Sequence, residues 1–120
     1  MIRKTVKVLA LTLLLTTLSM AQKEALLVGV SDYAGTENDF SDGIEQDIAN
    51  MKSLFEQWGF KVTVLFNKDS LKLDNYLNDY SQNLKENDKF VFYYSGHGYQ
   101  ISDENGDEVD DKQDEILEPI

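Results

Sequence analysis

The sequence predicts an α/β fold built on a mostly parallel sheet with flanking helices. Three short apolar runs, at residues 25–30, 62–66 and 90–94, are rich in β-branched and aromatic side chains and read as strands. Two longer segments between them have helical periodicity. Because a β-α-β-α-β order is typical of right-handed crossovers between parallel strands, we expect the three runs to share one sheet.

The first run, residues 25–30, reads Ala-Leu-Leu-Val-Gly-Val and contains no polar side chain. This pattern is typical of a strand that is buried on both faces. A polar, glycine-containing loop at residues 31–42 follows it. In an open parallel sheet, ligands bind where strands end, so this loop and those after Asn67 and Tyr94 are the places to seek function.

The first helix is expected to follow that loop. Asp42 and Glu45 have the spacing of a capping box, and Gly59 can end the helix in a left-handed conformation. Apolar residues between them recur at intervals of four and three, as on one face of a helix: Ile44, Ile48, Met51, Phe55 and Trp58. We expect Phe55, Trp58 and the helical tyrosines to belong to the core rather than to a site.

The second helix is expected to begin at Ser70, after the strand at residues 62–66. Its predicted buried stripe consists of Leu73, Leu77, Tyr80 and Leu84, and Asn87-Asp88 ends it before the third strand. The loop that follows Asn67 offers only Lys68 and Asp69 and is expected to be a solvated turn.

Residues 1–21 have the features of a secretory signal peptide. Arg3, Lys4 and Lys7 precede an apolar run at residues 8–18, and Ser19-Met20-Ala21 provides the small residues of a cleavage site. The run is shorter than the about 20 residues that span a bilayer, so cleavage is favoured over an uncleaved membrane anchor. We therefore expect a secreted or periplasmic protein, with no membrane association after signal cleavage.

Composition excludes several classes of function. The 120 residues include 22 acidic and 11 basic side chains, for a net charge of −11. Such a chain is repelled by phosphate backbones, so a nucleic-acid partner is not expected. It also contains no cysteine, which excludes disulfides, thiolate metal sites and a cysteine nucleophile within these residues.

The only histidine, His97, follows the third strand in the sequence Ser-Gly-His-Gly. A lone histidine in a surface loop more often has no catalytic role, but its place at the carboxyl end of a central strand strengthens the case for one. There it could act as a general acid or base near neutral pH. The amide of Gly98 could donate a hydrogen bond to a developing oxyanion.

These residues resemble a known family. Residues 90–98 read Phe-Val-Phe-Tyr-Tyr-Ser-Gly-His-Gly and are followed by Gly-Asp-Glu at 106–108 and Asp-Glu at 114–115. This is similar to the histidine segment of caspase-like cysteine peptidases, in particular the metacaspases and bacterial caspase domains. Residues 25–33 resemble the family's first strand, and residues 46–51 its first helix. The resemblance implies a caspase-like three-layer sandwich, incomplete in this chain, with residues 22–120 as the amino-terminal part of the peptidase domain.

The resemblance also implies roles for individual residues. His97 would be the catalytic histidine that protonates the leaving amine, and the Gly98 amide would help to form the oxyanion hole. Asp47 matches an acidic residue of the primary specificity pocket in metacaspases, which prefer arginine or lysine before the cleaved bond. Read without the family, Asp47 is equally well a carboxylate that the dipole favours at a helix start.

Acidic side chains dominate residues 103–118. The simplest interpretation is a solvated charged loop, although such a density of carboxylates also suits calcium. An EF-hand loop that starts at Asp103 would need glycine at its sixth position, where Glu108 stands, so that motif is excluded. In the family, the aspartate that matches Asp114 belongs to a calcium site. No cofactor is required by the implied chemistry, and calcium stays an open expectation.

Two hypotheses follow. In the first, the chain is part of a cysteine-type endopeptidase that cleaves polypeptides after Arg or Lys. Its nucleophile would lie beyond Ile120, since family nucleophiles stand roughly 50 residues past the histidine, and these 120 residues alone would be inactive. In the second, the chain is a non-catalytic caspase-like module, or a truncated relic, that binds peptide or calcium through Asp47 and the acidic segment.

Overall fold

The computed structural model describes residues 20–33, 35, 39–40, 43–118 and 120. The predicted signal peptide lies almost wholly outside the described residues, and so does Asp42 of the predicted capping box. In the part of the chain that is described, no helix combines the length and apolar character needed to cross a membrane.

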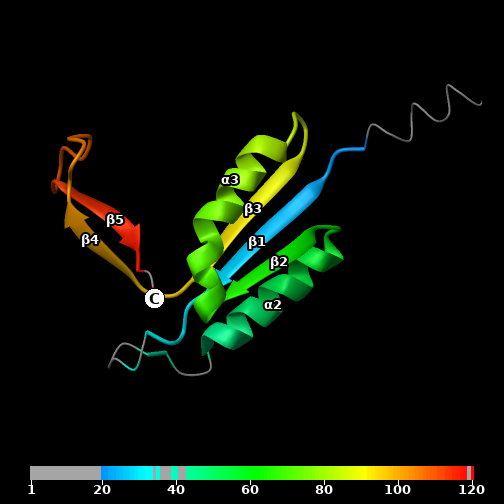
Figure 1. The fold of residues 1–120 in the computed structure, drawn as a ribbon, viewed down its shortest axis with the longest axis horizontal. Helices are drawn as coiled ribbons and strands as arrows, with labels where there is room; N and C mark the ends of the chain where they lie inside the picture. Colours follow the sequence, from blue (N-terminus) through cyan, green and yellow to red (C-terminus); the bar gives the residue numbers. More distant parts are fainter. Residues whose placement is uncertain (1–19, 34, 36–38, 41–42, 119) are drawn as a thin grey trace, which may run out of the picture.

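The centre of the fold is a three-stranded sheet. It consists of β1 (Lys23–Gly29), β2 (Lys61–Phe66) and β3 (Lys89–Ser95), in the order β2-β1-β3. Both pairs are parallel, and Val28 of β1 is in register with Leu65 and Tyr94. The three strands therefore end at the same edge of the sheet (Figure 1), and the predicted mostly parallel α/β fold is confirmed.

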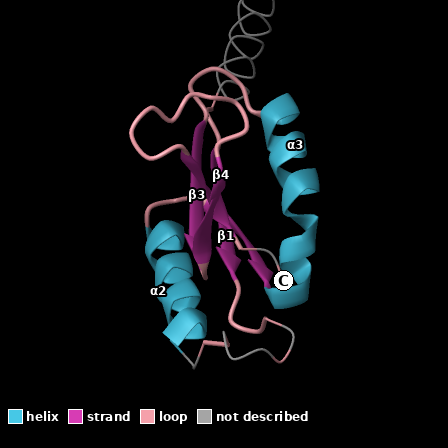
Figure 2. Ribbon diagram, turned by 90° about the vertical axis from the view of Figure 1, so that its left-hand side faces the viewer, coloured by secondary structure: helices cyan, strands magenta, loops and turns pink. Residues whose placement is uncertain are grey.

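Helices cover both faces of this sheet (Figure 2). The first is α2 (Gly43–Gln57), and the second, α3 (Leu73–Asn83), follows the 3-10 helix η1 (Asn67–Lys72). Side chains of β1 alternate between the two layers: Leu26 and Val28 pack on the side of α3, whereas Ala25 and Leu27 pack against α2. This explains the uninterrupted apolar sequence of β1, because both of its faces are buried.

Three details of the predicted elements are wrong. Trp58 is 56% exposed instead of buried, because α2 ends at Gln57 and the chain turns at Gly59, whose φ of 83° is the predicted left-handed one. Leu77 is exposed, since Tyr76 takes its place against the sheet. The second helical segment begins at Asn67 as a 3-10 helix and becomes α-helical only at Leu73.

The acidic segment is not simply a solvated loop. Part of it forms β5 (Gln113–Leu117), which pairs antiparallel with β4 (Gly98–Ser102) in a separate two-stranded sheet. Figure 1 shows this hairpin projecting from the end of β3, away from the three-stranded sheet. The five residues of β4 are all exposed, so the hairpin lacks the apolar pattern that predicts the other strands.

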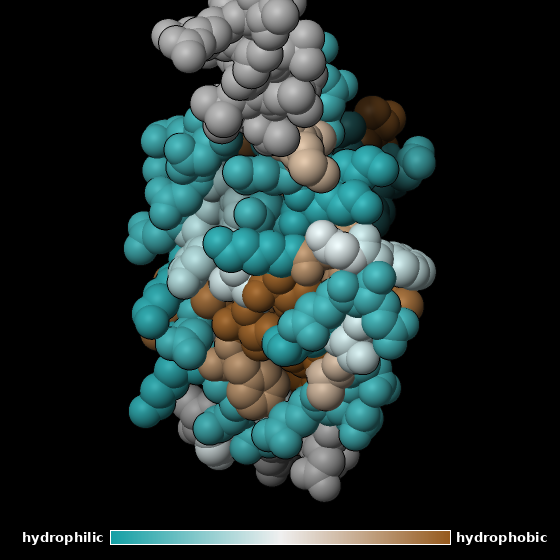
Figure 3. Space-filling model, turned by 90° about the vertical axis from the view of Figure 1, so that its right-hand side faces the viewer, coloured by the Kyte–Doolittle hydropathy of each residue, from teal (hydrophilic) through white to brown (hydrophobic). Residues whose placement is uncertain are grey.

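The molecule retains visible apolar surface. Figure 3 shows an apolar area at the centre of one face, bordered by hydrophilic side chains. Burial is concentrated in β1, where residues 25–28 are at most 1% exposed, whereas no residue of α3 is fully buried. Side-chain burial is therefore greatest at the middle strand, β1, and lower toward both edges of the sheet.

Candidate functional site

The candidate site lies at the carboxyl edge of the parallel sheet. Segments that follow the three strands meet there: residues 31–33 after β1, Asn67 after β2, and residues 96–98 after β3. The hydrogen bond from the amide of Val30 to the carbonyl of Ser95, at 2.9 Å, continues the β1–β3 pairing into this edge. The position predicted for function from strand order alone therefore gathers three distant segments.

The imidazole of His97 lies against aromatic rings from the loop after β1. Its ring centroid is 4.0 Å from that of Phe40, with an interplanar angle of 27°, and 4.8 Å from that of Tyr33. Phe40 is itself 39% exposed, and His97 is half-buried. The ring is thus supported by apolar surface while part of the residue stays accessible to solvent.

Both main-chain polar groups of His97 are hydrogen-bonded. Its amide donates to the phenol oxygen of Tyr33 at 2.6 Å. Its carbonyl accepts from the Tyr94 hydroxyl at 2.8 Å and from the amide of Glu118 at 2.9 Å. Burial, followed by the contact with Tyr33, raises the pKa of the Tyr94 phenol well above its ordinary value, so this hydroxyl stays protonated and can donate.

The two glycines beside His97 differ in what they permit. A Cβ at Gly96 would lie 2.5 Å from the Tyr94 hydroxyl oxygen and 2.8 Å from that of Tyr33, so a side chain there displaces both. Gly98 is the exposed first residue of β4 and pairs with Leu117. The tight packing at Gly96 shows why this segment needs glycine before the histidine.

Asp47, the predicted specificity residue, lies near the same edge. It is exposed on α2, and its Oδ2 accepts a hydrogen bond from Ser95 Oγ at 3.3 Å. Since Ser95 is two residues before His97, the structure brings the carboxylate of Asp47 and the histidine segment together. Sequence reasoning did not identify Ser95 as the link between them.

Asn67 is a further residue that the sequence did not single out. Its Oδ1 accepts from the amides of Ser31 and Asp32, at 2.8 and 3.2 Å, and so holds the start of the loop after β1. Asn67 has a φ of 51°, a conformation that asparagine tolerates better than most residues. An asparagine directly after a predicted strand was the available signal for this role.

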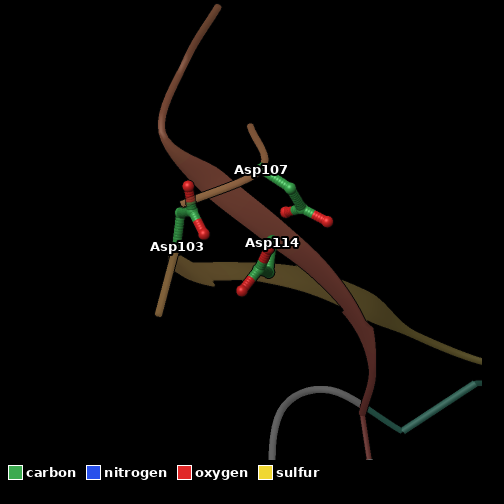
Figure 4. Close-up of side chains that lie close together, drawn as sticks. All are labelled: Asp103, Asp107 and Asp114. Carbon is green, nitrogen blue, oxygen red and sulfur yellow. The ribbon is translucent and has the colours of Figure 1, made fainter. Parts of the chain in front are cut away.

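A second cluster lies where the loop of the β4–β5 hairpin meets β5. Carboxylate oxygens of Asp103, Asp107 and Asp114 lie within 4.8 Å of one another, and Figure 4 shows the three groups converging. Asp103 also accepts the amide of Gly106 at 2.6 Å, which shapes the loop. The cluster lies at the Ser102–Gln113 end of the hairpin, whereas His97 adjoins the Gly98–Leu117 end, so the structure does not bring Asp114 and His97 together.

Comparisons with known proteins point to one family. Residues 22–119 match the model of the caspase domain. The chain is 33% identical to Metacaspase-1 of Scheffersomyces stipitis over 116 aligned positions, which cover 82% of this chain and 27% of that protein. It is 32% identical to Metacaspase-6 of Arabidopsis thaliana over 108 positions, covering 81% of this chain and 29% of that protein. The chain thus spans little more than a quarter of the length of these relatives.

Proposed function

This chain belongs to the caspase domain family, and on that premise we propose that it supplies the histidine half of a cysteine-type endopeptidase site. The observation that carries the proposal is the environment of His97. Its main chain is held at both polar groups, and its ring rests on Phe40 at the carboxyl edge of the sheet. A general acid needs such a fixed position, because proton transfer requires a defined distance to the reacting group.

The reaction follows the chemistry of a thiolate and an imidazolium. A cysteine thiolate attacks the peptide carbonyl carbon and forms a carbon–sulfur bond, while the carbonyl electron pair moves to oxygen. The amide of Gly98 donates a hydrogen bond to that oxyanion. When the tetrahedral intermediate collapses, His97 gives its proton to the departing amine, and water later hydrolyses the thioester.

The nucleophile must come from outside these 120 residues, which contain no cysteine. We propose that it is carried by polypeptide beyond Ile120. The 120 residues alone are then inactive, because neither the imidazole nor the Gly98 amide can replace the attacking sulfur.

Substrate preference is assigned to Asp47. Its carboxylate is exposed, and it accepts a hydrogen bond from Ser95, which stands two residues before His97 in the chain. A carboxylate in this position favours a cationic side chain next to the cleaved bond. The proposed substrates are therefore polypeptides with arginine or lysine before that bond.

The proposed function is tested by reading the coding sequence beyond Ile120 for a strand followed by cysteine. The polypeptide with that cysteine should hydrolyse a peptidyl-arginine fluorogenic substrate, and the His97→Ala variant should not. Glu45→Gln, a charge change at an exposed position of α2, serves as the control. Full activity of His97→Ala would remove the histidine from the mechanism.

Calcium binding by the hairpin is the second candidate function. The three converging carboxylates of Asp103, Asp107 and Asp114 support it, since carboxylate oxygen is the ligand that calcium prefers. It does not depend on catalysis and would also suit a non-catalytic caspase-like module. Calcium titration of the 120-residue chain, followed by its melting temperature, tests this candidate.

The site of action is proposed from residues 1–21 alone. Their basic start, apolar run and small residues favour export followed by cleavage after Ala21, which would place the mature protein in the periplasm or outside the cell. Mass spectrometry of the protein after export would show Gln22 as its first residue if this cleavage occurs.

A further inference from the structure

We infer that Tyr33 and Tyr94 are positioning residues whose two hydroxyls close a ring of hydrogen bonds around the main chain of His97. The inference rests on the proposed function, since it assigns these tyrosines the task of orienting the proposed acid. Neither tyrosine is expected to touch substrate. Their effect is exerted through His97 alone.

The direction of each hydrogen bond follows from counting protons. The amide of His97 can only donate, so the Tyr33 oxygen, 2.6 Å away, is the acceptor. The carbonyls of His97 and Glu118 can only accept, and the Tyr94 hydroxyl donates its single proton to the nearer one, that of His97 at 2.8 Å rather than that of Glu118 at 3.2 Å. The two phenol oxygens lie 3.4 Å apart, and the Tyr33 proton is the one still able to join them.

The ring of hydrogen bonds thus runs from the His97 amide through Tyr33 and Tyr94 to the His97 carbonyl. Each link raises the polarity of the next, as in other hydrogen-bonded chains. Loss of the Tyr33 hydroxyl removes the hydrogen bond of the His97 amide, whereas loss of the Tyr94 hydroxyl removes one of two hydrogen bonds to the His97 carbonyl and leaves the one from the Glu118 amide. A lost hydrogen bond at a half-buried group is unfavourable, so the segment should shift to restore hydrogen bonding.

The surroundings hold both hydroxyls in place. Tyr33 is 4% exposed, and its own amide donates to Asp39 Oδ1 at 2.7 Å. Tyr94 belongs to β3 and packs against the core cluster that contains Val28. The absence of a side chain at Gly96 leaves room for both phenol oxygens, since a Cβ there would approach each of them within 2.8 Å.

The consequence for the imidazole is geometric. With both main-chain groups of His97 fixed, its ring can move only through side-chain rotation, and its stacking on Phe40 restricts that rotation. This ring of hydrogen bonds from Tyr33 and Tyr94, the clamp, therefore presents the imidazole in one orientation at the carboxyl edge of β3. Such preorganisation lowers the barrier of a step that needs an aligned proton donor.

The test uses nuclear magnetic resonance on the 120-residue chain, where His97 is the only histidine and its ring protons give a single set of signals. The variants are Tyr33→Phe and Tyr94→Phe, which remove one oxygen each and keep the ring. Tyr93→Phe is the matched control, because Tyr93 is the neighbouring residue of β3 and packs on the opposite face. Amide exchange and ring-proton shifts of His97 are compared among them.

In Tyr33→Phe, the His97 amide should exchange roughly fivefold to tenfold faster, the factor that corresponds to one lost hydrogen bond. In both Tyr33→Phe and Tyr94→Phe, the ring-current shifts caused by stacking on Phe40 should move toward those of a free histidine. Tyr93→Phe should change neither. Values for Tyr33→Phe and Tyr94→Phe that match those for Tyr93→Phe would overturn the inference.

Two further readouts keep the result decisive. If the phenylalanine variants unfold, amide exchange in the wild-type chain still tests the inference. A wild-type His97 amide that exchanges at the rate of an unstructured peptide contradicts the clamp. In the polypeptide that carries the cysteine, Tyr33→Phe should lower kcat roughly tenfold with KM unchanged. If the His97 signals change in Tyr33→Phe and Tyr94→Phe but the cysteine-bearing polypeptide hydrolyses no peptide, the proposed function is refuted and the clamp is not. If that polypeptide hydrolyses peptides but the His97 signals stay the same in both variants, the clamp is refuted and the proposed function is not.

Discussion

The phenol oxygen of Tyr33 lies 2.6 Å from the main-chain nitrogen of His97, which is 64 residues further along the chain. This hydrogen bond joins the loop after β1 to the loop after β3. It exists because the two strands are parallel neighbours that end in register, with Gly29 opposite Ser95. The parallel sheet thus determines which residues support the candidate acid.

Gly96→Ala should destabilise the protein by about 1–3 kcal/mol, the usual cost of forcing extra atoms into a packed region. The new methyl group would meet the hydroxyls of Tyr33 and Tyr94. Urea denaturation of the 120-residue chain measures the change. Gly43→Ala is the control, since a Cβ at Gly43 meets nothing within 4 Å and should leave the free energy of unfolding within about 0.5 kcal/mol.

Stability should fall at alkaline pH through Tyr94. Burial raises the pKa of this phenol above its ordinary value of 10.0, so the folded state holds the proton more tightly than the unfolded chain. The resulting stabilisation is complete below pH 10 and is lost as the pH rises beyond it. Urea midpoints measured between pH 8 and about pH 11 should therefore drop more for the wild type than for Tyr94→Phe. Equal drops in the two proteins would show that Tyr94 is not responsible.

Asp47→Asn should lower kcat/KM for a peptidyl-arginine substrate by about tenfold or more, since a charge-assisted hydrogen bond contributes about 1.5–3 kcal/mol. The effect should be much smaller for a substrate with an uncharged residue in the same position. The measurement requires a polypeptide that carries the proposed cysteine. Glu45→Gln changes the same charge two residues away on α2 and should leave both rates unaltered. Equal losses on the two substrates would contradict a role in specificity.

Millimolar calcium should raise the melting temperature of the 120-residue chain, and Asp114→Asn should abolish most of that rise. The reason is that Asp114 supplies one of the three converging carboxylates. Glu115→Gln is the matched control: it is the next residue of β5, and its carboxylate instead accepts from Gln100 on β4. A calcium effect that is equally weakened in both variants would indicate general screening of negative charge.

The spacing of apolar residues predicted most of the fold, because most of its helices and strands have a distinct buried side. The apolar run of β1 is buried on both faces, and the four-and-three spacing of Ile48 and Phe55 places them on the buried side of α2. The same spacing included Trp58, which is exposed because the helix has already ended there. Helix periodicity cannot by itself locate the last residue that faces the sheet.

The hairpin and the support of His97 could not be predicted in the same way. β5 reads Gln-Asp-Glu-Ile-Leu, and its pairing with β4 depends on main-chain contacts rather than on an apolar face. Tyr33 and Tyr94 look like ordinary core aromatics in the sequence. Their polar role arises only when the fold brings their hydroxyls to the same main-chain segment.

The most direct test of the central claim is the rate of peptide hydrolysis by a polypeptide that joins this chain to the proposed cysteine, with and without the imidazole of His97. The account predicts that His97→Ala reduces kcat by roughly a hundredfold or more, the usual contribution of a positioned general acid, while the protein stays folded. A folded His97→Ala protein that retains the wild-type kcat would contradict it.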